Sequence, residues 1–116
     1  MKIIAIVGFC LSLIGLPVAA SADLLAAKNG MTLYTFSKDT PGNSACSWHC
    51  IKVWHPAEAG DADGPAFGAI TREGGARQLT HDGKPLYYYI GDHRPGDANG
   101  DGMDQLWRVV ASAEFR

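Results

Sequence analysis

Two cysteines and two histidines lie close together near the middle of the sequence. Cys46 and Cys50 flank His49, and His55 follows shortly after them. In an oxidising compartment, two cysteines this close favour a disulfide, which would fix a local bend in the chain. If the thiols were reduced, two thiolates and a histidine would suit a soft ion such as Cu(I) or Zn²⁺. The disulfide is the favoured interpretation, and a copper- or zinc-handling or thiol-redox site is the alternative.

A second set of residues carries side-chain oxygen atoms at alternate positions, as in loops that bind Ca²⁺. These residues are Asp97, Asn99, Asp101 and Asp104. Arg108 stands where an EF-hand loop that starts at Asp97 would need a glutamate, so the motif is not an EF-hand. A calcium site of another kind is one interpretation. A turn-rich loop that needs no ion is the other, and the sequence favours it.

The sequence contains no motif that indicates an enzyme. Ser44 and Ser47 lie near histidines, but they lack the glycine context of a nucleophile elbow. The formal net charge is −2 and lysine and arginine form no run, which argues against nucleic acid as a partner. The sequence therefore favours a non-catalytic binding or interaction module, with a small ligand or an envelope protein as its partner.

Residues 1–22 have the pattern of a cleavable secretory signal peptide. Lys2 precedes an apolar run, and Ala20-Ser21-Ala22 matches the small-residue pattern that signal peptidases cleave. This predicts cleavage after Ala22 and a periplasmic or secreted protein that is not inserted in the membrane. Cys10 leaves a lipid anchor as an alternative, although Phe9 stands where a lipoprotein signal needs a small residue. Export would place the cysteine pair in an oxidising compartment.

The remaining residues, 23–116, are predicted to form one small antiparallel β domain. Asn29-Gly30 and Asp82-Gly83 are tight-turn dipeptides flanked by short apolar runs, and Glu73-Gly74-Gly75 separates two further runs. Residues 45–54 predict one short helix or turn at the cysteine pair, ended by a proline. The expected fold class is mainly β, built from two pseudo-repeated hairpins, with α+β as the alternative.

The two tight turns open two similar stretches of sequence, residues 30–42 and 83–96. Each contains a leucine–tyrosine pair, a second aromatic residue, an aspartate and a Pro-Gly step. The matching motif residues are Tyr34 with Tyr87, Phe36 with Tyr89, and Asp39 with Asp92. Alternate residues of a strand face the same side, so the two aromatic residues of each copy should share one face and the leucine the other. We expect the aspartates to close turns, with a pair of ligand-binding carboxylates as the alternative.

The aromatic residues predict either the core of this domain or a groove for a sugar, a peptide or a quinol-like ligand. The core is favoured, because each large ring can bury much apolar surface. Tyr88 is out of phase with its two tyrosine neighbours and is expected to face outward. The aromatic residues concerned are Tyr34, Phe36, Trp48, Trp54, Tyr87, Tyr88, Tyr89 and Trp107.

Together these motifs resemble a widespread bacterial family of small secreted proteins and lipoproteins, described as secreted repeats of unknown function. The resemblance rests on the Tyr-x-aromatic-x-x-Asp motif, present at Tyr34 and again at Tyr87. It rests also on Cys46-x-x-x-Cys50 followed by Trp54, and it covers nearly the whole chain from residue 29 to residue 110. The resemblance implies a location outside the cytoplasm and a repeat fold. It implies no activity that can be carried over to this chain.

Overall fold

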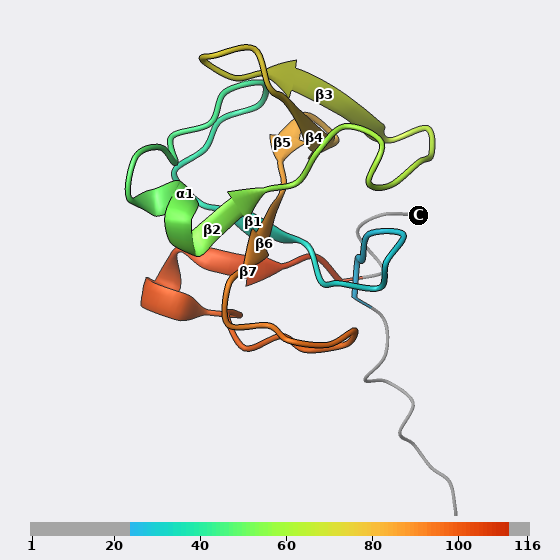
Figure 1. Cartoon of the computed structure of the whole chain (residues 1–116), viewed down its shortest axis with the longest axis vertical. Coiled ribbons are helices and arrows are strands. Elements are labelled where there is room, and N and C mark those ends of the chain that lie inside the picture. Colours follow the sequence, from blue (N-terminus) through green and yellow to red (C-terminus); the bar gives the residue numbers. More distant parts are fainter. Residues whose placement is uncertain (1–23, 112–116) are drawn as a thin grey trace, which may run out of the picture.

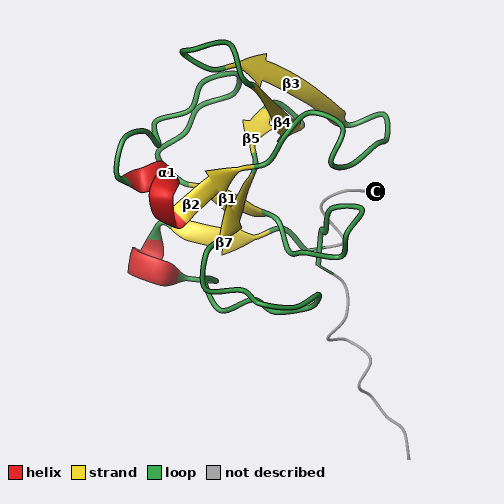
Figure 2. Cartoon of the chain, in the orientation of Figure 1, coloured by secondary structure: helices red, strands yellow, loops and turns green. Residues whose placement is uncertain are grey.

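The structure is a computed structural model that describes residues 24–111. Over these residues the chain forms two antiparallel sheets and one short α-helix next to a disulfide (Figures 1 and 2). The mainly β fold class is therefore confirmed. The predicted signal peptide, residues 1–22, and its cleavage site lie outside the described residues. No helix in the described part of the chain has the length and apolar character needed to cross a membrane.

The larger sheet has four strands in the order β2-β6-β1-β7. They are β1 (Tyr34–Phe36), β2 (Trp54–Pro56), β6 (Tyr87–Tyr89) and β7 (Trp107–Val109). The smaller sheet, in the order β3-β4-β5, consists of β3 (Phe67–Thr71), β4 (Arg77–His81) and β5 (Lys84–Pro85). In Figure 1 the smaller sheet lies above the larger one. The helix α1 (Cys50–Val53) precedes β2, and the 3₁₀ turn η3 (Met103–Gln105) precedes β7.

The two sequence copies interleave in the four-stranded sheet. β1 of the first copy pairs with β6 of the second, with Tyr34 opposite Tyr87. β2, which follows the first motif, pairs with β6, and β7, which follows the second motif, pairs with β1. Strands of the two copies therefore alternate across the sheet, and the pairing scheme is unchanged when the copies are exchanged. The sequence predicted two repeated units, and the structure adds that each completes the sheet of the other.

The turns that the dipeptides predict are present. At Asn29-Gly30 the Ala27 N–H donates to the Met31 carbonyl at 2.9 Å, and Gly30 has the positive φ of +87° that such a turn requires. The turn at residues 72–76 joins β3 to β4, which pair over their full five residues. Asp82-Gly83 joins β4 to β5. The three predicted hairpin connections are confirmed.

Two clusters of buried side chains lie against these sheets. One is aliphatic and contains Leu33 and Leu86, which are fully buried. The other is mostly aromatic and contains Tyr34 and Tyr87, which are also fully buried. Neighbours along a strand thus enter different clusters, as the predicted alternation of leucine and tyrosine requires. Full burial of one such side chain stabilises the fold by about 1.5–3 kcal/mol.

Two local predictions are corrected by the structure. Tyr88 does not face outward: it is half-buried against the aliphatic cluster, and its hydroxyl donates to the Asp61 carboxylate at 2.6 Å. The reason is that β6 is an inner strand with side chains packed on both faces. The short helix is confined to Cys50–Val53, and Trp54 already begins β2. β2 tolerates Pro56 because it is the outer strand of its sheet.

Candidate functional site

A disulfide joins Cys46 to Cys50, with their Cα atoms 5.3 Å apart. Cys46 is fully buried in the aromatic cluster, while His49 and His55 are exposed. The His55 Nε2 atom lies 3.2 Å from the Lys52 carbonyl oxygen. A soft-metal site at these residues would need both thiolates, and the disulfide removes them. The disulfide therefore closes a small loop, and Cys46 fixes one end of that loop in the core.

Between the two cysteines the disulfide encloses Ser47, Trp48 and His49, and we call residues 46–50 the Trp48 loop. The Trp48 backbone has a φ of +57°, in the left-handed region that a bulky side chain rarely adopts. Its side chain is 83 % exposed. The chain thus bears a conformational cost of about 1–2 kcal/mol and gains no burial of the largest side chain in the loop. Such a combination points to a use outside the fold itself.

A cavity of about 400 Å³ lies beside the Trp48 loop. One side of it comes from the loop and α1, and the other from the first two residues after β3. Its lining combines apolar, cationic, anionic and hydroxyl side chains. The lining residues are Ser47, Trp48, His49, Ile51, Lys52, Arg72 and Glu73.

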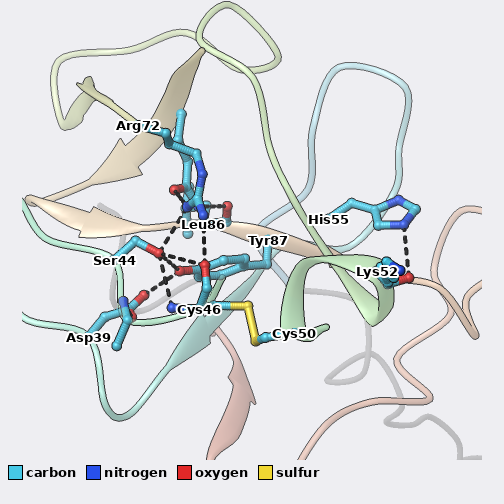
Figure 3. The surroundings of a disulfide bond; sticks show 11 residues. Asp39, Ser44, Cys46, Cys50, Lys52, His55, Arg72, Leu86 and Tyr87 are labelled. Atoms are coloured by element: carbon cyan, nitrogen blue, oxygen red, sulfur yellow. Dashed lines mark hydrogen bonds between the residues drawn. A yellow bond between two sulfur atoms is a disulfide. The ribbon is translucent and has the colours of Figure 1, made fainter. Parts of the chain in front are cut away.

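Arg72 holds this loop against the smaller sheet (Figure 3). Its Nη2 donates to the Cys46 carbonyl at 2.6 Å. Its Nη1 donates to Ser44 Oγ at 2.9 Å and to Gln78 Oε1 at 2.7 Å. Gln78 is buried in β4 and donates in turn to the Leu86 carbonyl at 2.8 Å. One guanidinium thus ties the disulfide, the preceding loop and the β4 strand together.

The hydrogen bonds continue from Ser44 into the core. Ser44 Oγ lies 2.6 Å from the Tyr87 hydroxyl, which donates to Asp39 Oδ2 at 2.7 Å. Since Tyr87 gives its single proton to the carboxylate, Ser44 is the donor to Tyr87, and Ser44 Oγ accepts from Arg72. Asp39 Oδ1 accepts the Ala45 N–H at 2.6 Å. Figure 3 shows this chain of donors, which runs from Arg72 to Asp39.

Burial dominates the electrostatics of these groups. It raises the pKa of Asp39, and the bonds from Ala45 and Tyr87 and the charge of Arg72 oppose this only in part. Burial also raises the pKa of Tyr87 far above its ordinary value, more than the bond from Ser44 lowers it. Tyr87 is therefore a neutral phenol at neutral pH.

The second motif aspartate makes the matching contacts. The Tyr34 hydroxyl donates to Asp92 Oδ2 at 2.7 Å, and Asp92 Oδ1 accepts the Asn99 N–H at 2.9 Å. The tyrosine of each motif thus binds the aspartate of the other motif. Each aspartate accepts a backbone N–H, as expected, but from a residue six or seven positions along the chain and not within a tight turn, and the tyrosine partners were missed. The spacing could have indicated these partners. A tyrosine side chain that points from a strand into the core is directed away from an aspartate five residues later in the same copy, which leaves the aspartate of the other copy as its partner.

Apart from the exposed Trp48, the aromatic residues that the sequence singled out pack in the core. Phe36, Trp107, Trp54 and Tyr89 stack in that order, with ring centroids 4.1, 3.9 and 4.5 Å apart. The two indoles in the centre are 3 % and 5 % exposed and lie parallel to within 1°. The four rings come alternately from the two copies, so the stack repeats the interleaving of the strands.

The predicted calcium loop uses its oxygen atoms to close turns. Asp97 Oδ2 accepts the His93 N–H at 2.9 Å, which lowers the pKa of Asp97, and Asp101 Oδ1 accepts the Val109 N–H at 3.1 Å. Asn99 donates its side-chain amide to the Gly91 carbonyl, and Asp104 is exposed. From residue 24 to residue 111 no three His, Cys, Asp or Glu side chains are grouped so that they could hold a metal ion. The geometry therefore gives no support to a calcium site or to the soft-metal alternative.

A larger cavity, of about 720 Å³, lies between the first hairpin and the loop that precedes β3. Its ionisable lining residues already have partners: Lys28 Nζ lies 2.8 Å from Asp63 Oδ2, and His81 Nδ1 lies 3.7 Å from Asp82 Oδ2. The rest of its lining is mostly alanine, glycine and proline, with Leu25 and Phe67. These residues offer few groups that could select a ligand, so the cavity beside the Trp48 loop is the stronger candidate.

Comparison with known proteins supports the repeat. A family model described as a secreted repeat of unknown function matches the chain twice, at residues 22–58 and 68–111. The first match contains β1, α1 and β2, and the second contains β6, η3 and β7. No curated protein and no solved structure matches the chain significantly.

Proposed function

Since the chain belongs to the family of secreted repeats of unknown function, we propose that it is a non-catalytic binding module whose binding element is the Trp48 loop. The observation that carries this proposal is the exposed Trp48 indole, held at a positive φ by a disulfide-closed loop beside a cavity. Its partner would be a small ligand or a component of the cell envelope.

A binding role accounts for the cost of the loop. Tryptophan and arginine are the residues that most often dominate binding energy at interfaces, and both line this cavity. A loop closed by a covalent bond and braced by Arg72 loses little further entropy when a ligand binds. The Trp48 loop is therefore organised for binding before any ligand arrives.

The polar groups beside the loop do not support catalysis. A nucleophilic serine needs a base, and the hydrogen-bond partners of Ser44 within the described residues are Arg72, Tyr87 and Cys46. Tyr87 cannot be that base, because burial raises its pKa and keeps its proton on the phenol. The network is better suited to holding the loop in place than to moving protons.

We place this module outside the cytoplasm, released by cleavage after Ala22 as one domain of residues 23–116. The signal-peptide pattern of residues 1–22 and the family description support this. N-terminal sequencing of the exported protein should begin at Asp23. A lipid-modified N-terminus at Cys10 would contradict the release.

Binding can be tested on the exported protein with a panel of immobilised neutral glycans, acidic glycans and peptides. We expect at least one component to bind, and Trp48→Ala to weaken that binding by about tenfold or more, which corresponds to about 1.4 kcal/mol. The matched control is Ile90→Ala, which removes an exposed apolar side chain outside the cavity. The proposal is wrong if Trp48→Ala binds every component as the unaltered protein does.

A further inference from the structure

The cavity beside the Trp48 loop joins an open aromatic face to polar groups. Trp48 is 83 % exposed, so its ring is accessible to a ligand. Ile51 adds apolar surface, and Ser47 and Glu73 add a hydroxyl and a carboxylate. A sugar ring needs this mixture, because it has C–H groups on its faces and hydroxyl groups around its edge. The faces pack on an aromatic ring, and the hydroxyls bind the polar side chains.

The charges in the lining favour a negative ligand. Lys52 and Arg72 are cationic, and Glu73 is the single carboxylate that lines the cavity. The hydrogen bonds of the Arg72 guanidinium go to neutral groups, and Asp39 lies beyond Ser44 and Tyr87 in the donor chain. In the part of the chain from residue 24 to residue 111, neither Lys52 nor Arg72 forms an ion pair. A carboxylate brought by a ligand could pair with Lys52, and Arg72, whose charge also acts on Asp39, would add to the attraction.

Resting on the proposed function, we propose that this cavity binds an acidic sugar, a pyranose ring that carries a carboxylate, as one residue of an anionic polysaccharide. The ring packs on the Trp48 indole. The carboxylate points to Lys52 and Arg72. The Glu73 carboxylate accepts hydrogen bonds from the sugar hydroxyl groups, and the Ser47 hydroxyl donates to them or accepts from them.

The size and the walls of the cavity favour a sugar over a peptide. A volume of about 400 Å³ lies at the small end of the range for ligand sites, which suits a single ring. A peptide bound through its main chain would need a free strand edge at the site. The cavity is lined by the Trp48 loop, α1 and residues 72–73, and none of these is a strand.

The test uses the full exported protein and two probes that differ at the carboxyl group: an oligosaccharide of galacturonic acid, which is charged, and its methyl-esterified form, which is neutral. Isothermal titration calorimetry should show that the acid form binds at least about tenfold more tightly than the ester, and that added salt reduces this difference. Lys52→Gln should weaken binding of the acid form about fivefold and leave binding of the ester unchanged. The matched control Lys38→Gln, which removes an exposed lysine outside the cavity, should bind both probes as the unaltered protein does.

The possible failures are distinguishable from one another. If acid and ester bind equally, and both depend on Trp48, the preference for a charged sugar is wrong and the binding module stands. If neither probe binds but a peptide or a neutral glycan binds in a Trp48-dependent way, the sugar assignment is again wrong and the module stands. If no ligand depends on Trp48, both proposals fail. Because Trp48 and Lys52 are exposed, the thermal melting of each variant should show an intact fold.

Discussion

At the scale of single residues, the family motif is explained by hydrogen bonds in which the tyrosine of each copy binds the aspartate of the other. Tyr34 binds Asp92 and Tyr87 binds Asp39, so each aspartate fastens a loop of its own copy to a tyrosine of the other. The hydroxyls and carboxylates are buried or half-buried, where an unpaired polar group is costly. The motif therefore stabilises the fold.

Removing one motif hydroxyl should cost more than removing a hydroxyl outside the motif. Tyr87→Phe leaves Asp39 Oδ2 and the Ser44 hydroxyl without their partner, and Tyr34→Phe does the same to Asp92 and to the Gly100 N–H. We expect each to lower the free energy of unfolding by about 1–3 kcal/mol, measured by urea denaturation.

The control for the motif tyrosines is Tyr89→Phe. The Tyr89 hydroxyl makes no hydrogen bond to the described part of the chain, and Tyr89 contributes its ring to the aromatic stack. Its loss should change the stability by less than about 0.5 kcal/mol. If Tyr87→Phe and Tyr89→Phe lowered the free energy of unfolding equally, the hydrogen bond between Tyr87 and Asp39 would not have the stabilising role assigned to it.

The raised pKa of Asp39 predicts a dependence of stability on pH. The folded state holds this proton more tightly than the unfolded state, where the pKa is near 3.8. The contribution of Asp39 is therefore complete below pH 3.8 and is lost as the pH rises through the folded-state value. Measured from about pH 3 to pH 7, the unaltered protein should lose stability relative to Asp39→Asn. A gain in stability with rising pH, relative to this variant, would show that the folded pKa is lowered instead.

We expect Trp48 to contribute to ligand binding and to lower the stability of the fold, because its backbone has a positive φ. A glycine at this position relieves the positive φ, whereas an alanine does not. We expect Trp48→Gly to raise the free energy of unfolding by about 1 kcal/mol and Trp48→Ala to leave it nearly unchanged, by urea denaturation. Both variants should lose ligand binding. If Trp48→Gly were less stable than Trp48→Ala, the left-handed backbone would not be a cost that the loop bears.

At the scale of elements, the stacked rings fix how closely the chain can approach the sheet. Gly100 lies against this stack: a Cβ atom there would come within 2.6 Å of the Trp54 ring and 2.9 Å of the Tyr89 ring. The Trp54 ring is buried between Trp107 and Tyr89, so it cannot move aside without displacing its neighbours. The loop that precedes η3 therefore needs a residue without a side chain at this point.

Gly100→Ala should destabilise the protein by about 1–3 kcal/mol, because the added methyl group overpacks the aromatic cluster. The control is Gly68→Ala in β3, where the added Cβ atom meets a single side-chain atom, Thr80 Oγ1 at 3.2 Å, and no ring. Thermal melting of both variants gives the comparison. If Gly100→Ala and Gly68→Ala had the same melting temperature, the aromatic stack would be able to accommodate the added methyl group, and the predicted overpacking would be wrong.

Much of the element pattern could be predicted from the sequence, because it is set locally. Asn29-Gly30 and Asp82-Gly83 favour tight turns whatever surrounds them. β2 could not be predicted, since three residues that contain Pro56 have no strand signal of their own and pair only because β6 is beside them. The cavity was missed for the same reason. Arg72 and Glu73 reach the Trp48 loop through the tertiary fold, and no spacing in the sequence joins them to it.

At the scale of the whole molecule, neither copy can form its half of the large sheet alone. β1 has β6 and β7 as neighbours, and both come from the second copy. The aromatic stack and the tyrosine–aspartate bonds also cross between copies. Many of the contacts that stabilise the fold therefore join one copy to the other, and we expect the two copies to fold together.

A chain cut between Asp63 and Gly64, in the loop that joins β2 to β3, should assemble from its two pieces. Each piece alone lacks every partner strand of its own large-sheet strands, so we expect an unfolded amide spectrum by NMR. Mixed in equal amounts, the pieces should give the dispersed spectrum of the intact protein. A dispersed spectrum from either piece alone would show that one copy folds independently.

The interleaved sheet also has a consequence for the history of the chain. A protein with a single copy could complete this sheet only by pairing with a second identical molecule, and the internal symmetry is what duplication and fusion of its gene would leave. In such a pair every feature occurs twice. Here Met103, at the start of η3, packs on the aromatic cluster as Cys50, at the start of α1, does, and of these two residues only Cys50 forms a disulfide. A single chain with two copies is free of that constraint, so that one half carries the Trp48 loop while the other serves as its scaffold.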